Sequence, residues 1–177
     1  ATVIKEGDEY RGVRGIVRDI TERKQIEEAL RNSEQKLRLT FESINETIVL
    51  TDLEGHILDI NEAGIKKSGY RFKSQIIGLN GLQFFKEEAR PRVLEQLDIL
   101  LKEGSVPIIS SQIVSTTSQI YDVEASAVLL RDDTGEPTGI IVVIRDVTER
   151  KRMEEALRDS EEKLRFMFAS IIDAVVV

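Results

Sequence analysis

The sequence predicts an α+β fold in which a small strand-rich core stands between two long amphipathic helices. Short β-branched runs are grouped at 47–60 and at 107–147, and segments with helical spacing fill 61–102 between them. A strongly charged segment with helical spacing stands on each side of this core. A period of about two residues is typical of strands and one of about 3.6 residues of helices. The core therefore reads as two strands, three short helical pieces and three strands.

A repeated motif marks both ends of the core. The string Arg-Asp-Val-Thr-Glu-Arg-Lys at 145–151 also stands at 18–24, with Ile in place of Val, and segments 18–50 and 145–177 are identical at 20 of 33 positions. A long internal repeat indicates a tandem array, so we expect one complete domain with a fragment of a similar domain on each side. The expected parts are the C-terminal strands of an upstream domain at 1–20, a linker and N-terminal amphipathic helix at 21–46, the complete core at 47–147, an outgoing helix at 148–169 and the first strand of a downstream domain at 170–177.

Turn and cap residues give the core its internal boundaries. Gly55 stands between two β-branched runs, which predicts a hairpin. Asn61 can cap a short helix that Gly69 ends, because a side-chain oxygen accepts from the first free N–H groups and glycine adopts the left-handed conformation. The expected core elements are strands at 47–52 and 56–60, helical segments at 61–67, 74–77 and 88–102, and strands at 107–115, 119–130 and 140–144.

The two flanking helices share an apolar stripe. In both copies, apolar or small residues recur at gaps of 4, 3, 4, 3 and 4 residues, which is the spacing of a coiled-coil seam. Two interpretations remain open: each helix lies on its own domain, or the helices form the parallel seam of a homodimer. The residues expected in a dimer seam are Ile26, Leu30, Leu37, Met153, Leu157 and Leu164.

Composition excludes several classes of function. The chain has 25 basic and 32 acidic residues and a net charge of −7, which argues against a nucleic-acid partner. Its lack of Cys excludes disulfides and thiolate metal sites. The longest internal apolar run, 140–144, is far too short to span a bilayer. We expect a soluble, cytoplasmic segment without direct membrane contact, although its parent protein can carry a membrane anchor elsewhere.

Neither catalytic residues nor a metal site are predicted. The single His, His56, falls in a turn and reads as a solvated residue. Adjacent carboxylates such as Glu87 and Glu88 lie in polar runs, and neighbours in a helix do not face one another. We therefore expect that this part of the chain is not an enzyme.

Several strings resemble those of PAS domains with linkers of the sensor-kinase type. They are Gly-His-Ile-Leu-Asp-Ile-Asn-Glu-Ala at 55–63, Ser-Gly-Tyr at 68–70, Ile-Gly at 77–78 and the repeated Asp-Val-Thr-Glu-Arg-Lys at 146–151. The resemblance covers about 33–150 as one complete unit. It implies a five-stranded antiparallel sheet with helices over one face and a central cleft that can hold a small ligand. It also identifies 1–24 and 159–177 as pieces of neighbouring PAS domains.

The resemblance implies a relay at the end of the last strand. The Asp-Val-Thr motif links the core to the outgoing helix, so Asp146 would lock the strand end by an ionic or hydrogen-bonded contact. Thr148 would turn the chain and cap the helix through its hydroxyl. The signal-relay residues are Asp146, Val147, Thr148, Glu149 and Arg150, with Asp19 and Thr21 in the earlier copy.

A ligand pocket is a further expectation, with no cofactor assigned. Light-sensing flavin members of the family use a Cys that this chain lacks, and haem-binding members use an axial His that His56 does not match. Apolar residues that line a cleft or simply fill a packed core are Ile60, Ile65, Phe84, Phe85, Leu97, Ile113, Val123 and Val142.

The function that these features favour is a signal-relay and dimerisation module of a multi-domain signalling protein, of the sensor histidine kinase type in a two-component system. Its partners would be a second copy of the chain and the adjacent PAS and output domains of the same protein. A sensor that holds a small molecule or cofactor in the cleft is the alternative, and a passive dimerising spacer is the third possibility.

Overall fold

The computed structural model describes residues 2–6, 9–14 and 19–175, and within them the side chains of 19–106 and 108–167. The chain divides into two compact units, 1–40 and 41–177. In the first unit, β1 (Thr2–Glu6) and β2 (Glu9–Arg14) form a two-stranded antiparallel sheet. Two of the strands expected within 1–20 are therefore present, and residues 15–18 lie outside the described part of the chain.

The incoming helix α1 spans Thr21–Ser43, so its last residues belong to the second unit. Its first N–H groups include that of Thr21, which donates to Asp19 Oδ1 at 2.9 Å. The helix runs for 23 residues without a buried side chain. The helix is stabilised by the helical propensity of its residues and by charged pairs along its surface. In one such pair, Arg23 Nε lies 2.8 Å from Glu27 Oε1.

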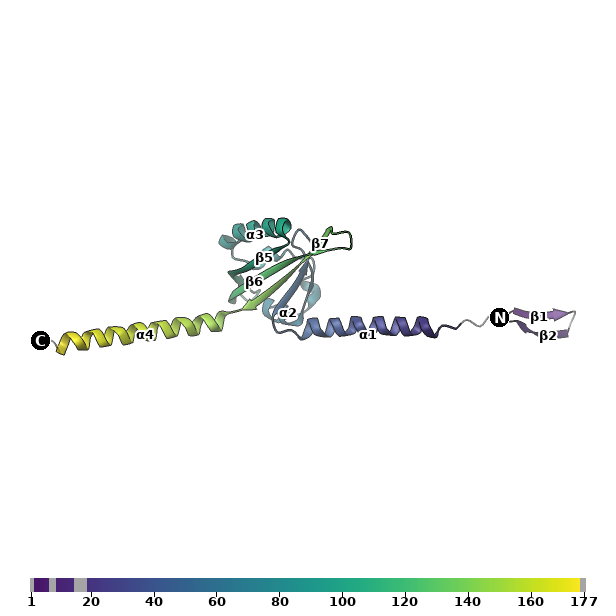
Figure 1. The fold of residues 1–177 in the computed structure, drawn as a ribbon, viewed down its shortest axis with the longest axis horizontal. Coiled ribbons are helices and arrows are strands. Elements are labelled where there is room, and N and C mark those ends of the chain that lie inside the picture. Colours follow the sequence, from purple (N-terminus) through teal and green to yellow (C-terminus); the bar gives the residue numbers. More distant parts are fainter. Residues whose placement is uncertain (1, 7–8, 15–18, 176–177) are drawn as a thin grey trace. The chain divides into compact units, whose positions relative to one another are not determined.

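The second unit is built on a five-stranded antiparallel sheet with the order β4-β3-β7-β6-β5 (Figure 1). This confirms the fold class expected from the sequence. The strands are β3 (Thr47–Thr51), β4 (Ile57–Ile60), β5 (Ser105–Val114), β6 (Ile120–Arg131) and β7 (Pro137–Asp146). The last strand, β7, lies at the centre between β3 and β6, which explains why 140–144 is apolar at every position.

Helix α2 (Glu62–Ser68) and helix α3 (Arg90–Glu103) cover one face of this sheet, together with the short turns η1 (Lys73–Gln75), η2 (Gly81–Phe84) and η3 (Glu87–Ala89). Thr51 and Val142 line cavities beneath both helices, so the two helices share a face. Helix α2 packs tightly on β3, because a Cβ built on Gly64 would lie 2.9 Å from Thr47 Cγ2.

Helix α4 spans Thr148–Val175, and here one prediction is wrong. We expected a strand at 170–177, but 170–175 continue the helix and 176–177 lie outside the described residues. In the earlier copy, the corresponding strand β3 pairs with both β4 and β7. Among the described residues, no strand pairs with 170–175, and an apolar sequence without a partner strand keeps the local hydrogen bonds of the preceding helix.

Candidate functional site

The joint between β7 and α4 is held by hydrogen bonds from three elements. The carboxylate of Asp146 accepts from the N–H of Thr148 at 2.9 Å, and Val147 is buried with 3% of its surface exposed. The hydroxyl of Thr148 accepts from the N–H of Asp122 on β6 at 2.9 Å. The sequence-based role of Thr148 is therefore corrected: Asp146 satisfies the first N–H of the helix, and the hydroxyl of Thr148 ties the joint to β6.

Asp146 also pairs with a residue that the sequence analysis did not single out. Lys67 Nζ in the last turn of α2 donates to Asp146 Oδ2 at 2.6 Å, and the two side chains are 22% and 29% exposed. Partial burial acts to raise the pKa of Asp146, but the hydrogen bonds from Lys67 and Thr148 and the charge of Lys67 outweigh it, so the pKa lies below its ordinary value. Asp146 is thus an anion that holds both α2 and α4.

A second chain of polar contacts reaches the first turn of α4 from the other side of the fold. Lys151 Nζ and Gln112 Nε2 both lie 3.2 Å from Asp122 Oδ1, and Lys86 Nζ donates to Gln112 Oε1 at 2.7 Å. The hydrogen bond from Gln112, followed by that from Lys151, lowers the pKa of Asp122. Of the remaining predicted relay residues, Arg150 forms an ion pair with Glu124 on β6, and Glu149 is exposed.

The incoming end of the unit is organised by one buried amide. Asn61 has no exposed surface, and its Oδ1 accepts from the N–H groups of Ile48 and Gly64 at 3.0 and 3.1 Å. Its Nδ2 donates to the carbonyl oxygens of Phe41, Ile44 and Glu46, at 3.3, 3.2 and 2.8 Å. Asn61 therefore binds the end of α1, the start of β3 and the first turn of α2 to one another.

The incoming and outgoing segments meet at the same corner. Arg145 Nε, next to Asp146, lies 2.6 Å from Glu46 Oε1, next to the start of β3. Helix α2 spans this corner, because Asn61 at its first turn holds the incoming segment and Lys67 at its last turn holds the outgoing joint. A shift of α2 would therefore change the contacts of both.

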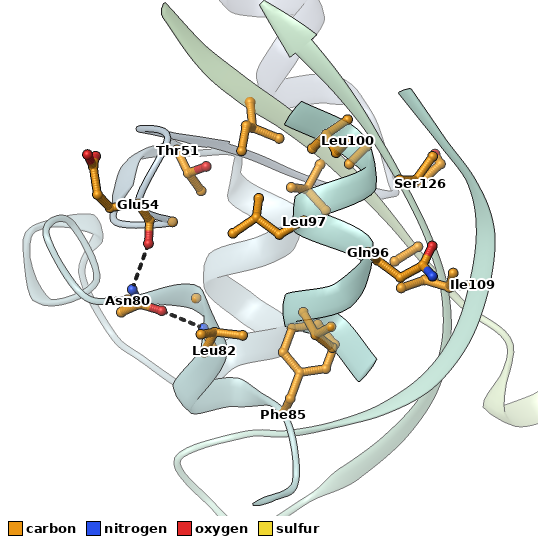
Figure 2. Close-up of a pocket in the computed structure, with 18 residues that line it drawn as sticks. Thr51, Glu54, Asn80, Leu82, Phe85, Gln96, Leu97, Leu100, Ile109 and Ser126 are labelled. Atoms are coloured by element: carbon orange, nitrogen blue, oxygen red, sulfur yellow. Dashed lines mark hydrogen bonds between the residues drawn. The ribbon is translucent and has the colours of Figure 1, made fainter. Parts of the chain in front are cut away.

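Two apolar cavities lie between the helices and the sheet. The α3 cavity encloses about 130 Å³ beneath Leu97 and Leu100 of α3, whose side chains Figure 2 shows on its wall. The α2 cavity encloses about 100 Å³ beneath α2 and is bounded by β3, β7 and the end of β5. Both are lined by Thr51, Gly81, Phe85 and Val142, so Phe85 forms part of the partition between them.

Most of the predicted pocket residues line one of these cavities. Phe85, Leu97 and Val142 line the α3 cavity, and Phe85 and Val142 also line the α2 cavity, together with Ile60, Phe84 and Ile113. Ile65 packs against the hydrophobic core, and Val123 is fully buried without lining either cavity. Polar lining residues such as Thr47 and Gln96 were missed, because apolar patterning identifies only the apolar part of a cavity wall.

The described lining of the two cavities contains neither a histidine nor a cysteine. His56 lies in an isolated bridge to Asn80 outside both cavities, and its Nδ1 lies 3.0 Å from Asp52 Oδ2. Asp52, Glu54 and His56 are the one group of possible metal ligands gathered within 4.8 Å in the described part of the chain. Two of these three residues are exposed, and Asp52 already accepts from the N–H of His56 at 2.7 Å.

The residues of the expected dimer seam are exposed in the single chain. Ile26, Leu30 and Leu37 on α1 are 63%, 59% and 69% exposed. Met153, Leu157 and Leu164 on α4 are 62%, 62% and 46% exposed.

Residues 45–149 match the sequence profile of the PAS domain. The chain belongs to the PAS domain family. This PAS domain is similar to solved PAS structures, among them one from Colwellia psychrerythraea with a TM-score of 0.60 and 21% sequence identity, a match that covers 65% of this chain and 97% of the other.

Two of the curated relatives are named as sensors. A methyl sulfide methyltransferase-associated sensor of Methanosarcina acetivorans is 29% identical over 141 residues, and the sensor histidine kinase TmoS of Ectopseudomonas mendocina is 30% identical over 138 residues. These matches cover 79% and 77% of this chain but 14% of each relative. The chain thus spans about a seventh of the length of these proteins. Within the described residues, no helix combines the length and the hydropathy that a bilayer crossing requires.

Proposed function

We propose that this PAS domain is a signal-relay and dimerisation module of a larger signalling protein of the sensor histidine kinase type. The observation that carries the proposal is the pair of Lys67 and Asp146, which connects α2 in the core to the start of α4. The similarity to sensory proteins supports this class of parent protein.

The relay would work through a change in the position of α2. Lys67 is the only side chain of α2 that the structure pairs with Asp146 among the described contacts, and Asp146 also holds the first N–H of α4. A shift of α2 that lengthens the contact with Lys67 would free the carboxylate and loosen the joint. Helix α4 would then change its packing or register, which requires two states that the contact stabilises to different extents.

Dimerisation would use the exposed stripes on the two long helices. Burial of a large aliphatic side chain contributes about 1.5–3 kcal/mol, so an exposed row such as Met153, Leu157 and Leu164 is stabilised by a partner helix. A second copy of the chain supplies an identical row, as a parallel coiled coil requires. The adjacent PAS and output domains of the parent protein are the other proposed partners.

The relay is tested by Asp146→Ala in the full-length parent protein, with its signal-dependent output as the readout. We expect the response to be lost while the circular dichroism of the 177-residue chain stays close to wild type and its unfolding temperature falls by only a few degrees. A normal response would exclude the relay and leave a passive spacer.

A ligand-binding sensor is the second candidate, and the two apolar cavities favour it. Their walls are formed mainly by apolar side chains, and the α2 cavity lies under the helix that carries Lys67. Mass spectrometry of an extract from the purified, denatured protein tests this function. A bound small molecule at stoichiometric amount is the expected result, and an empty extract would contradict a tightly held ligand.

A further inference from the structure

A polar groove runs along the open edge of β5, which is the last strand of the sheet. Within the described residues, the one bridge on the outer side of this strand joins Ile113 to Phe85. Four successive residues, 109–112, line the groove. Because successive side chains of a strand point to opposite faces of a sheet, a groove lined by all four follows the edge of the backbone itself.

The first half of β5 is protected against the addition of another strand, whereas the second half is not. Pro107 lies in the strand, and the register with β6 shifts between Val106 and Ile109. Proline and bulges both keep edge strands from pairing with other chains. Residues 109–112 pair regularly with β6, and the described contacts include no backbone hydrogen bond from their outer side. An extended segment can therefore pair with 109–112.

Basic side chains outnumber acidic ones around this groove, although the chain as a whole has a net charge of −7. The charged lining residues are Lys86, Arg92, Lys151, Glu88 and Asp122. Lys151 lies 3.2 Å from Asp122, so these two charges compensate each other. Lys86 donates to a neutral amide, and Arg92 is exposed without an ion pair or hydrogen bond among the described residues. The remaining positive charge is complementary to an acidic occupant.

We propose that this groove binds a short extended peptide segment with two or more acidic side chains, which adds to the edge of β5 as a further strand. The main chain of the segment bonds to 109–112, and its carboxylates face Lys86 and Arg92. The groove encloses about 430 Å³, against about 130 and 100 Å³ for the α3 and α2 cavities, so it has room for a chain segment. Because Lys151 lines the groove, the occupant also contacts the first turn of α4.

The test uses the peptide acetyl-Thr-Glu-Val-Glu-Val-Thr-amide. Its controls are the same peptide with Lys in place of Glu and a copy that is N-methylated at its four central residues, which cannot donate hydrogen bonds to a strand. Each peptide is titrated into the 15N-labelled 177-residue chain, and the amide shifts of 109–112 are followed. We expect the unmodified acidic peptide alone to shift these amides. Its binding should weaken as salt is added, because salt screens exposed charges.

Two matched variants test the charge of the groove. Arg92→Glu reverses a charge in its lining, and Lys102→Glu makes the same change in the last turn of the same helix, outside the groove. Both residues are exposed, so the circular dichroism of both variants should match wild type. Arg92→Glu should weaken binding of the acidic peptide by about fivefold, as the loss of one exposed ion pair predicts, and Lys102→Glu should change it little.

The inference is overturned if the acidic peptide shifts none of the amides of 109–112, if the N-methylated copy binds equally well, or if the two variants bind the peptide equally. Free glutamate at the same concentration tests for a simple anion site, and the same shifts with glutamate would contradict an added strand. Shifts of these amides when the chain alone is concentrated would identify a second copy as the occupant and would also overturn the proposal. None of these results depends on the relay.

Discussion

Lys67 Nζ and Asp146 Oδ2 lie 2.6 Å apart and join two elements that are separated by 79 residues in the chain. The contact places a charged hydrogen bond between the last turn of α2 and the strand end from which α4 begins. With Asn61 at the other end of α2, it makes this helix of seven residues a bonded route between the incoming and outgoing segments, in addition to the direct ion pair of Arg145 with Glu46.

The ion pair of Lys67 and Asp146 should make the stability of the domain depend on pH in the acidic range. The folded pKa of Asp146 is lowered, so the unfolded state, with a pKa of about 3.9, takes up protons first as the pH falls. The contribution is therefore fully present above about pH 4–5 and is lost as the pH falls through the lowered folded value. Urea unfolding should show Asp146→Asn less stable than wild type at pH 7, by up to about 1 kcal/mol as for other partly exposed ion pairs, and the difference should shrink below pH 4. A constant difference between pH 3 and pH 7 would contradict the ionic role.

Asn61 should be a large contributor to stability. Asn61→Ala leaves buried carbonyl and N–H groups of α1, β3 and α2 without partners, so we expect a loss of about 3 kcal/mol in the free energy of unfolding. Asn80→Ala is the matched control, because Asn80 caps η2 through the N–H of Leu82 but is less buried, and a loss of about 1 kcal/mol is expected there. Equal losses in the two variants, measured by urea unfolding, would argue against the role of Asn61 as a buried hub.

The contact between Gln112 and Asp122 should be visible in a carboxylate titration. Gln112→Ala removes the strongest influence that lowers the pKa of Asp122, so this pKa should rise toward its ordinary value. Ser110→Ala, on the same strand, should leave it unchanged. The measurement is an NMR titration of the side-chain carboxyl group of Asp122. An unchanged pKa of Asp122 in Gln112→Ala would show that Lys151 alone keeps this pKa low.

The proposed dimer predicts a position-specific effect on association. Leu157→Lys places a charge in the seam of α4 and should raise the dissociation constant of the dimer at least about tenfold, since each copy loses a buried side chain. Glu155→Lys changes an exposed residue of the same helix outside the seam and should have little effect. Light scattering over a concentration series distinguishes the two. A monomeric wild-type chain at all concentrations would contradict dimerisation through these helices.

The fold could be predicted from local signals, whereas the connections of the site could not. Gly55 and Gly69 adopt φ values of 85° and 82°, so the glycines that marked turns and helix ends in the sequence mark them in the structure. Val123 and Ala125, which alternate with polar residues in the sequence of the strand predicted at 119–130, are likewise buried. Such signals depend on neighbouring residues and can be recognised without knowledge of the fold.

The partners of the joint come from distant parts of the chain, which is why they escaped prediction. Lys67 reads as an ordinary solvated lysine until the sheet order places it beside Asp146. The hydroxyl of Thr148 has the sequence context of a helix cap, but the backbone of Asp122 on β6 lies within reach and is bonded instead. The strand wrongly predicted at 170–177 has the same origin, because a strand forms only where another strand can pair with it, and 170–175 are helical.

The central claim is that movement of α2 reaches α4 through Lys67. The most direct test uses Ile60→Val, which removes one methylene beneath the start of α2. This change is made in three backgrounds, namely wild type, Lys67→Met and, as the matched control, Lys66→Met. Lys66 pairs with Glu62 within the same helix at 3.6 Å. The readout is the change in amide chemical shift that Ile60→Val causes at Val147, Thr148 and Lys151. We predict a clear change in the wild-type and Lys66→Met backgrounds and its loss in the Lys67→Met background. A change of the same size in all three backgrounds would contradict the relay through Lys67 and Asp146.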